Sequence, residues 1–137
     1  MKLLKSIFFL LSITFFISCG TYSNTTNTSN NIKEEPVVIA NEALEYEIII
    51  IDQGFTSYLN SIARPMSYHS KIYLQNKNRV YVAIWNSRAR NLTKYNPNIY
   101  ENIIEYEPNV DYGLEVNYKL FWYFKFAEQK YKMRLAY

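Results

Sequence analysis

The feature that most constrains this chain is its N-terminus, where a short basic region is followed by an apolar run. Lys2 and Lys5 precede the run, which covers residues 7–17. A membrane-spanning helix needs about 20 apolar residues, and this run is shorter. The layout is typical of a signal peptide over residues 1–18. The fold must therefore be sought in the residues that follow.

The apolar run ends in Phe16-Ile17-Ser18-Cys19, which resembles a bacterial lipobox. In that motif a signal peptidase cuts before a cysteine whose thiol carries a diacylglyceryl group. Cys19 is the sole cysteine of the chain, whereas Phe16 departs from the aliphatic residue that the motif prefers. A single acyl chain gives only marginal membrane binding, at about 0.8 kcal/mol per buried methylene, so three chains would anchor the protein stably. The alternative is an ordinary signal peptide with a chance cysteine.

Residues 19–36 are expected to form the lipidated cysteine and a flexible tether. Residues 20–35 are rich in Ser, Thr and Asn, a composition typical of linkers, and a flexible coil of that length spans roughly 20 to 25 Å. The tether lacks an acidic run after the cysteine. Such a run would be similar to the surface-export signals of Bacteroidota lipoproteins. We therefore expect a bacterial envelope protein that faces the periplasm, in either the inner or the outer membrane.

The composition of the remaining chain excludes several classes of function. Without Lys2 and Lys5, thirteen basic side chains face twelve acidic ones, which gives no electrostatic footprint for nucleic acid. One Cys excludes an internal disulfide framework, and His69 as the only histidine excludes poly-histidine metal sites. No G-x-S-x-G, H-E-x-x-H or glycine-rich phosphate loop is present. We expect a non-catalytic domain without metal or cofactor, in which His69 is structural.

Residues 37–137 are expected to fold as a single α+β domain, with a small mixed or antiparallel sheet packed by two short helices and a long C-terminal helix. The apolar patterns predict a buried strand over 46–51, helices over 55–62 and 67–75, and strands over 79–86 and 100–107 that pair as an antiparallel hairpin. The long helix covers 111–134. Its interior Gly113 implies that the helix starts there or that a neighbouring backbone passes close.

Three motifs carry a resemblance to a known family. They are Glu45-Tyr46-Glu47 with the isoleucine run after it, the segment KNRVYV at 77–82 followed by Trp85-Asn86, and the segment PNVDYGLEVNY at 108–118. Together they resemble a small family of Bacteroidota lipoproteins of unknown function, over roughly residues 40–135. The resemblance implies an envelope location and one domain, and it implies no activity, ligand or site residue.

A ligand surface is predicted where the hairpin end meets the start of the long helix. Tyrosines and asparagines cluster there, and tyrosine-rich surfaces recognise sugars and peptides. The predicted surface comprises Arg88, Arg90, Asp111, Tyr112 and Glu115. Its partner would be an envelope protein or a glycan, or the domain would serve as a scaffold, in an oligomeric state that the sequence leaves open. Alternatively, the tyrosines only cover a thin core.

A different function is possible for Asp111 and Glu115, which lie one helical turn apart. Paired carboxylates can hydrolyse a glycosidic bond, such as one in peptidoglycan, or bind a hard cation. The simpler interpretation is that both acids stabilise the start of the helix through its macrodipole.

The lipid anchor leads to the first prediction. In a detergent phase partition, the wild-type protein should follow the detergent phase because its N-terminal cysteine carries acyl chains. The variant Cys19→Ala should remain in the aqueous phase. If both proteins partition with water, the lipoprotein assignment is wrong.

Overall fold

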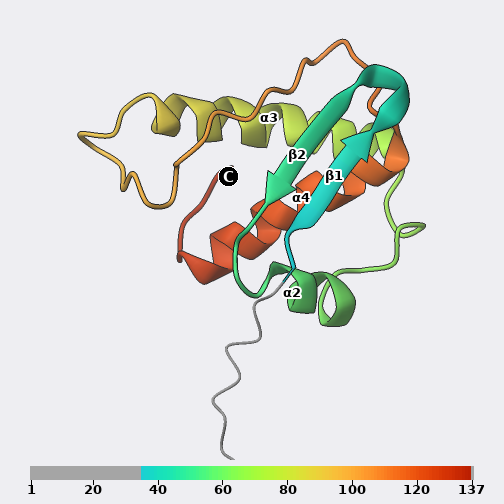
Figure 1. The fold of residues 1–137 in the computed structure, drawn as a ribbon, viewed down its shortest axis with the longest axis horizontal. Coiled ribbons are helices and arrows are strands. Elements are labelled where there is room, and N and C mark those ends of the chain that lie inside the picture. Colours follow the sequence, from blue (N-terminus) through green and yellow to red (C-terminus); the bar gives the residue numbers. More distant parts are fainter. Residues whose placement is uncertain (1–34, 137) are drawn as a thin grey trace, which may run out of the picture. The chain divides into compact units, whose positions relative to one another are not determined.

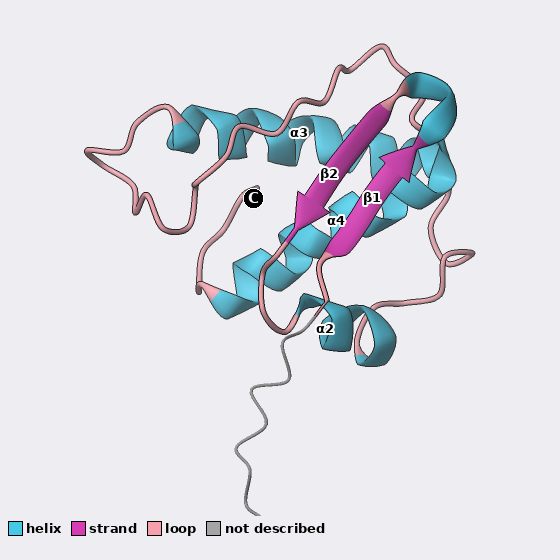
Figure 2. Cartoon of the chain, in the orientation of Figure 1, coloured by secondary structure: helices cyan, strands magenta, loops and turns pink. Residues whose placement is uncertain are grey.

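The computed structural model describes residues 35–136, which lie within one compact unit covering residues 33–137. The predicted signal peptide, Cys19 and nearly all of the tether lie outside the described residues. The elements are β1 (Val37–Asn41), the 3-10 turn η1 (Glu42–Leu44), β2 (Tyr46–Ile50), α2 (Phe55–Ser61), α3 (Lys71–Ala89) and α4 (Gly113–Lys130). The predicted α+β class is confirmed, and the sheet is antiparallel (Figures 1 and 2).

Helix α4 is the centre of the domain, because α2, α3 and β1 all pack against it. The predicted long C-terminal helix is thereby confirmed. Its buried side chains are more numerous than one stripe provides, as expected of a helix covered on several sides; they include Val116, Leu120, Phe121, Trp122, Phe124, Phe126 and Ala127. Within the described part of the chain, no helix is both long and apolar enough to cross a bilayer.

Gly113 begins α4, which resolves the choice left open by the sequence. Its φ is +83°, a left-handed conformation that glycine adopts at little cost and other residues rarely adopt. A Cβ at this position would lie 3.7 Å from Asn41 Nδ2, which is an ordinary contact. The glycine is therefore explained by the backbone turn into the helix and not by crowding.

Strands β1 and β2 form a hairpin that packs one face on the core. Its cross-strand pairs run from Val37 with Ile50 to Asn41 with Tyr46. Ile39 and Ile50 are buried, whereas Val38 and Ile49, which face each other on the outer side, are 44% and 56% exposed. The strand predicted over 46–51 is confirmed as β2, but it is not buried as predicted, because only one of its faces packs on the core. β1 was not predicted.

The strand predicted over 79–86 is wrong, because these residues lie inside α3. Ser70 caps this helix by accepting a hydrogen bond from the Tyr73 backbone N–H at 3.2 Å. The helix predicted over 67–75 therefore starts later than predicted, at Lys71, and continues to Ala89. The side chains that α3 buries recur at helical spacing; they are Leu74, Asn78, Tyr81, Val82 and Trp85. Packing on α4 therefore overrides the β-propensity of RVYVAIWN, which depends strongly on context.

Helices α3 and α4 run parallel to each other. Lys71 at the start of α3 pairs with Asp111 at the start of α4, while Arg88 at the end of α3 donates to the Arg134 carbonyl beyond the end of α4. A 19-residue helix is about 28 Å long, so the chain must return by that distance between the two helices. Residues 90–112, which we call the return segment, make this connection without regular secondary structure.

The return segment is held to α3 by side-chain hydrogen bonds, so the strand predicted over 100–107 is also wrong. The Asn86 side chain acts as a backbone substitute, since its Nδ2 donates to the Ile104 carbonyl and its Oδ1 accepts from the Ile104 N–H, both at 2.8 Å. Trp85 Nε1 donates to the Asn102 carbonyl at 3.0 Å. Arg79 and Gln75 reach carbonyls farther along the segment. Residues 79–86 and 100–107 therefore lie antiparallel beside each other, as predicted, but neither forms a strand.

The packing of α3 on α4 predicts where truncation is severe. Phe124 is fully buried and Trp85 is 3% exposed, so replacing either with Ala should lower the free energy of unfolding by about 3 to 5 kcal/mol. Val80, on the outer side of α3, is 47% exposed, and Val80→Ala should leave the stability nearly unchanged. Urea midpoints compare the three variants. Equal losses at Phe124 and Val80 would contradict this arrangement of α3.

Candidate functional site

The structure does not bring the five residues of the predicted ligand surface together. Asp111, Tyr112 and Glu115 lie at the start of α4, whereas Arg88 and Arg90 lie at the end of α3. Because the two helices are parallel, these groups are a helix length apart. The predicted surface depended on a hairpin over 79–107, and that hairpin is not formed.

The two acids at the start of α4 each have a lysine partner. Asp111 pairs with Lys71 and accepts a hydrogen bond from the Gly113 N–H at 3.0 Å, and the hydrogen bond from Lys71 is the main cause that lowers its pKa. Glu115 pairs with Lys119 at 2.7 Å, one helical turn away. Among residues 35–136, no group of three or more His, Cys, Asp or Glu side chains could hold a metal ion.

Arg88 and Tyr112 have mainly structural surroundings. Arg88 donates to the Tyr100 hydroxyl at 2.8 Å and to the Arg134 carbonyl, which ties the C-terminal residues to α3. Tyr112 is 5% exposed, and its ring lies 4.3 Å from that of Tyr46 between ring centroids. Its hydroxyl accepts from the Glu107 N–H at 2.8 Å. Of the predicted surface, Arg90, Asp111 and Glu115 are exposed.

His69 lies just before Ser70, which caps α3. Its ring stacks on Tyr73 at 4.5 Å between centroids and meets Phe121 edge-on at 5.5 Å. The histidine is half-buried. These contacts are consistent with the structural role expected from its position at the helix start.

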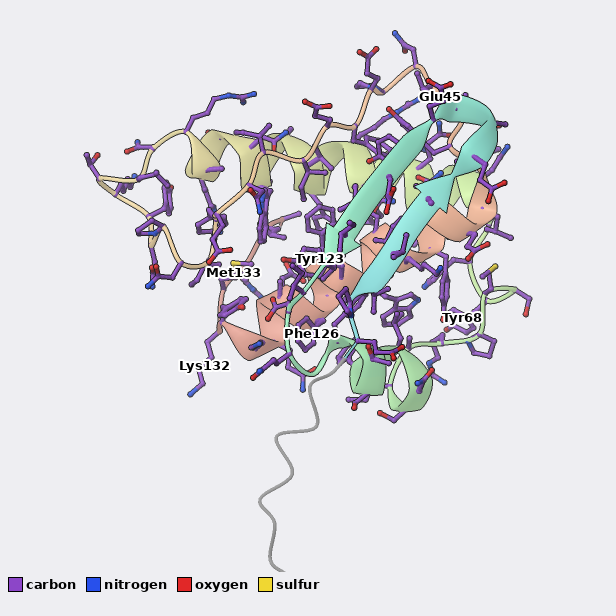
Figure 3. The ribbon with its side chains drawn as sticks, viewed as in Figure 1. Glu45, Tyr68, Tyr123, Phe126, Lys132 and Met133 are labelled. Atoms are coloured by element: carbon purple, nitrogen blue, oxygen red, sulfur yellow. The ribbon has the colours of Figure 1, made fainter. Side chains whose placement is uncertain are left out.

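A cavity lies elsewhere, between the end of β2, the return segment and the C-terminal half of α4. We call it the β2 cavity; its volume is about 510 Å³. Tyr123, labelled in Figure 3, lies beneath the C-terminal end of β2 on this side of the domain. The apolar lining comprises Ile48, Ile49, Ile50, Ile51, Trp85, Ile99, Ile104 and Tyr123, and the polar lining comprises Asp52, Gln53, Asn98, Glu101, Asn102, Lys130 and Tyr131.

Asp52 is the centre of the polar side of the β2 cavity. Its carboxylate pairs with Lys130 Nζ and accepts from the Tyr131 hydroxyl, which lies 2.8 Å from Oδ2. Burial raises the pKa of Tyr131 above its ordinary value, and the hydrogen bond to Asp52 raises it further. Tyr131 therefore stays protonated and holds Asp52 against the end of α4. The acid's charge is balanced within the cavity by Lys130.

Glu101 gives the β2 cavity its unbalanced charge. The salt bridges among the described residues involve other carboxylates. Burial is the main cause that raises the pKa of Tyr123, and the negative charges of Asp52 and Glu101 add to it. The cavity therefore combines apolar walls, a few convergent polar groups and an excess of negative charge. Such a combination is typical of a ligand-binding site.

Sequence reasoning missed the cavity residues, and no local pattern marks them. Asp52 directly follows the strand predicted over 46–51, and Glu101 lies within the strand predicted over 100–107. Lys130 and Tyr131 were placed near the end of a helix. Their proximity depends on the parallel packing of α3 and α4, which the sequence does not display.

The structure defines a small α+β domain with a cavity beside β2. A match to the family of unknown function DUF6146 covers residues 7–137, so the chain belongs to that family. The family's function is unknown, as the resemblance in the sequence implied. No curated protein and no solved structure matched the chain significantly.

The buried tyrosines predict a loss of stability at alkaline pH. Burial raises the pKa of Tyr106 to about 12, whereas an unfolded tyrosine titrates near 10. Between these values the unfolded chain has lost the proton and the folded chain has kept it, so alkali favours unfolding. The stability is fully present below pH 10 and falls as the pH rises toward 12, by up to about 1.4 kcal/mol per pH unit for each such tyrosine.

The measurement is the free energy of unfolding in urea between pH 9 and pH 12. Tyr106→Phe is the matched variant, because it removes the titrating hydroxyl and keeps the ring. We expect the free energy of unfolding of this variant to fall less steeply with pH than that of the wild type, by about the contribution of one tyrosine. Identical slopes for the two proteins would contradict the assignment to Tyr106.

Proposed function

We propose that this protein is a lipid-anchored component of the bacterial cell envelope, and that its globular domain binds a partner without catalysing a reaction. The anchor is Cys19, at the end of a basic-apolar leader, followed by a polar tether. The family match begins at residue 7 and therefore includes Cys19 as well as the domain. The lack of an acidic run after the cysteine supports a location that faces the periplasm.

The observation that supports binding is the β2 cavity. Its volume of about 510 Å³ lies within the range of cavities that hold small ligands or side chains of a partner. The rim is apolar and open, since Ile51 is 75% exposed and Ile49 is 56% exposed. Exposed isoleucines beside a cavity are expected at a surface that another molecule covers. An envelope protein or a glycan remains the class of partner, and nucleic acid is not among the proposed partners.

The alternative function, a glycan-active hydrolase or a cation-binding domain, would use Asp111 and Glu115. Each carboxylate is engaged by a lysine, and neither lines the β2 cavity. These contacts favour the role at the start of α4 over the chemical one. No observation in the structure favours the alternative, so the binding function is the one we propose.

Site-specific photo-cross-linking in the producing cell tests this function. A photoreactive p-benzoylphenylalanine at Ile51 stands on the rim of the β2 cavity. The control position is Ile72 on α3, which is 67% exposed and so similarly accessible to solvent. We expect a defined adduct at Ile51, a loss of that adduct with Glu101→Lys, and no such adduct at Ile72.

The outcomes separate the parts of the proposal. Equal cross-linking at both positions, or none at Ile51, would contradict a binding role for the β2 cavity. An adduct that persists when Cys19→Ala releases the protein from the membrane fraction would show that binding does not depend on the anchor. A hydrolytic activity abolished by Asp111→Asn and Glu115→Gln would replace the binding function with the chemical one.

A further inference from the structure

The two outer edges of the hairpin differ in how their backbone groups are satisfied. Lys119 Nζ donates to the Val38 carbonyl at 3.1 Å, so this carbonyl faces away from β2. In an antiparallel ladder, pairs that exchange backbone hydrogen bonds alternate with pairs whose groups face outward. Val38 is paired with Ile49. The N–H and C=O of Ile49 therefore face away from β1.

The same alternation places the backbone groups of Glu47 on the outer edge of β2, and Ile51 directly follows the strand. Among residues 35–136, only the β1 edge has the hydrogen bond from Lys119, and no hydrogen bond reaches the backbone of Glu47 or Ile49 on the β2 edge. Unpaired strand edges are templates for pairing with another chain. The edge of β2 is thus a row of unused donors and acceptors.

This free edge borders the β2 cavity. Consecutive residues from Ile48 to Gln53 line one side of the cavity, and residues 98–104 of the return segment contribute to the opposite side. Figure 1 shows the return segment on the side of β2 that faces away from β1. The space beside the edge is therefore neither filled by the chain's own strand nor simply open solvent.

We propose that the free edge of β2 binds an extended peptide segment of a partner protein as an added strand, with the peptide's inner side chains entering the β2 cavity. This inference rests on the proposed binding function and specifies its ligand. Strand addition supplies affinity through main-chain hydrogen bonds and specificity through pockets for alternate side chains. The edge from Glu47 to Ile51 spans about 13 Å, which a peptide of five residues matches.

The charge of the groove indicates which peptide it favours. Glu101 lines the cavity, Glu47 lies in β2, and Glu105 follows the lining residue Ile104 in the return segment. None of the three is in a salt bridge among the described residues. Lys130 is already paired with Asp52. Side chains of a strand alternate between its faces. The favoured ligand is therefore a peptide in which apolar residues, directed into the cavity, alternate with lysine or arginine.

The test uses the full chain in detergent micelles and a fluorescently labelled seven-residue peptide of alternating Val and Lys. We expect saturable binding by fluorescence anisotropy. A matched peptide of alternating Val and Glu should bind at least tenfold more weakly. Hydrogen exchange should slow at the Ile49 amide when the Val–Lys peptide is added, because that amide gains a partner on strand addition.

Proline substitutions on the two edges distinguish strand addition from other modes of binding. Ile49→Pro removes an N–H that faces the free edge, where proline is tolerated, and should weaken binding of the Val–Lys peptide at least tenfold. Val38→Pro makes the same change on the edge of β1 and should leave binding unchanged. Circular dichroism checks that both variants are folded. If a variant does not fold, the hydrogen exchange of the Ile49 amide in the wild type decides the test.

Three results would overturn the inference. The first is equal binding by the wild type and the folded Ile49→Pro variant, together with an Ile49 amide that stays unprotected. The second is that the Val–Lys peptide does not bind. The third is a dimer of this chain that excludes the peptide and dissociates with Ile49→Pro. In the last case the edge would pair with a second copy. A positive cross-link at Ile51 alongside any of these results would leave the binding function standing and reject only its peptide ligand.

Discussion

The parallel packing of α3 on α4 is the constraint on which the rest of the structure depends. Two parallel helices that follow each other in the chain need a connection as long as the helix itself. Residues 90–112 make that connection, and side chains of α3 such as Trp85 and Asn86 fix it by hydrogen bonds to its backbone. The hairpin then packs over α4 through β1. The space left between β2 and the return segment is the β2 cavity.

The sequence predicts those elements whose local pattern agrees with their packing. The strand at 46–51, helix α2 and the long helix that starts at Gly113 all have the periodicity of the structure they adopt. The segment at 79–86 fails because its β-branched and aromatic residues fit a strand with two apolar faces. In α3, Val80 is instead half-exposed and Trp85 is buried, which only the packing partner decides. β1 is five residues long and carries little signal of its own.

The candidate site could not be predicted from the sequence for a related reason. Asp111 and Glu115 were predicted as site residues because they are neighbours in one helix. Arg88 was predicted because of a hairpin that does not form. In the structure, Asp52, Glu101 and Tyr131 all line the β2 cavity. They come from three segments separated by about fifty and thirty residues. A site assembled in this way follows from tertiary structure and has no motif.

Each of the two walls of the β2 cavity is fixed by contacts on its far side, away from the cavity. β2 is paired with β1 on its far side, and the return segment receives the side chains of Trp85 and Asn86 from α3. A strand added to the free edge of β2 would therefore gain main-chain hydrogen bonds without breaking one within the domain. The free energy lost on binding then comes from the lost translational and rotational freedom, the ordering of the peptide and the desolvation of polar groups. An edge that is short, acidic through Glu47 and bordered by a cavity can remain open for a partner, because its length and charge limit pairing with further copies of itself.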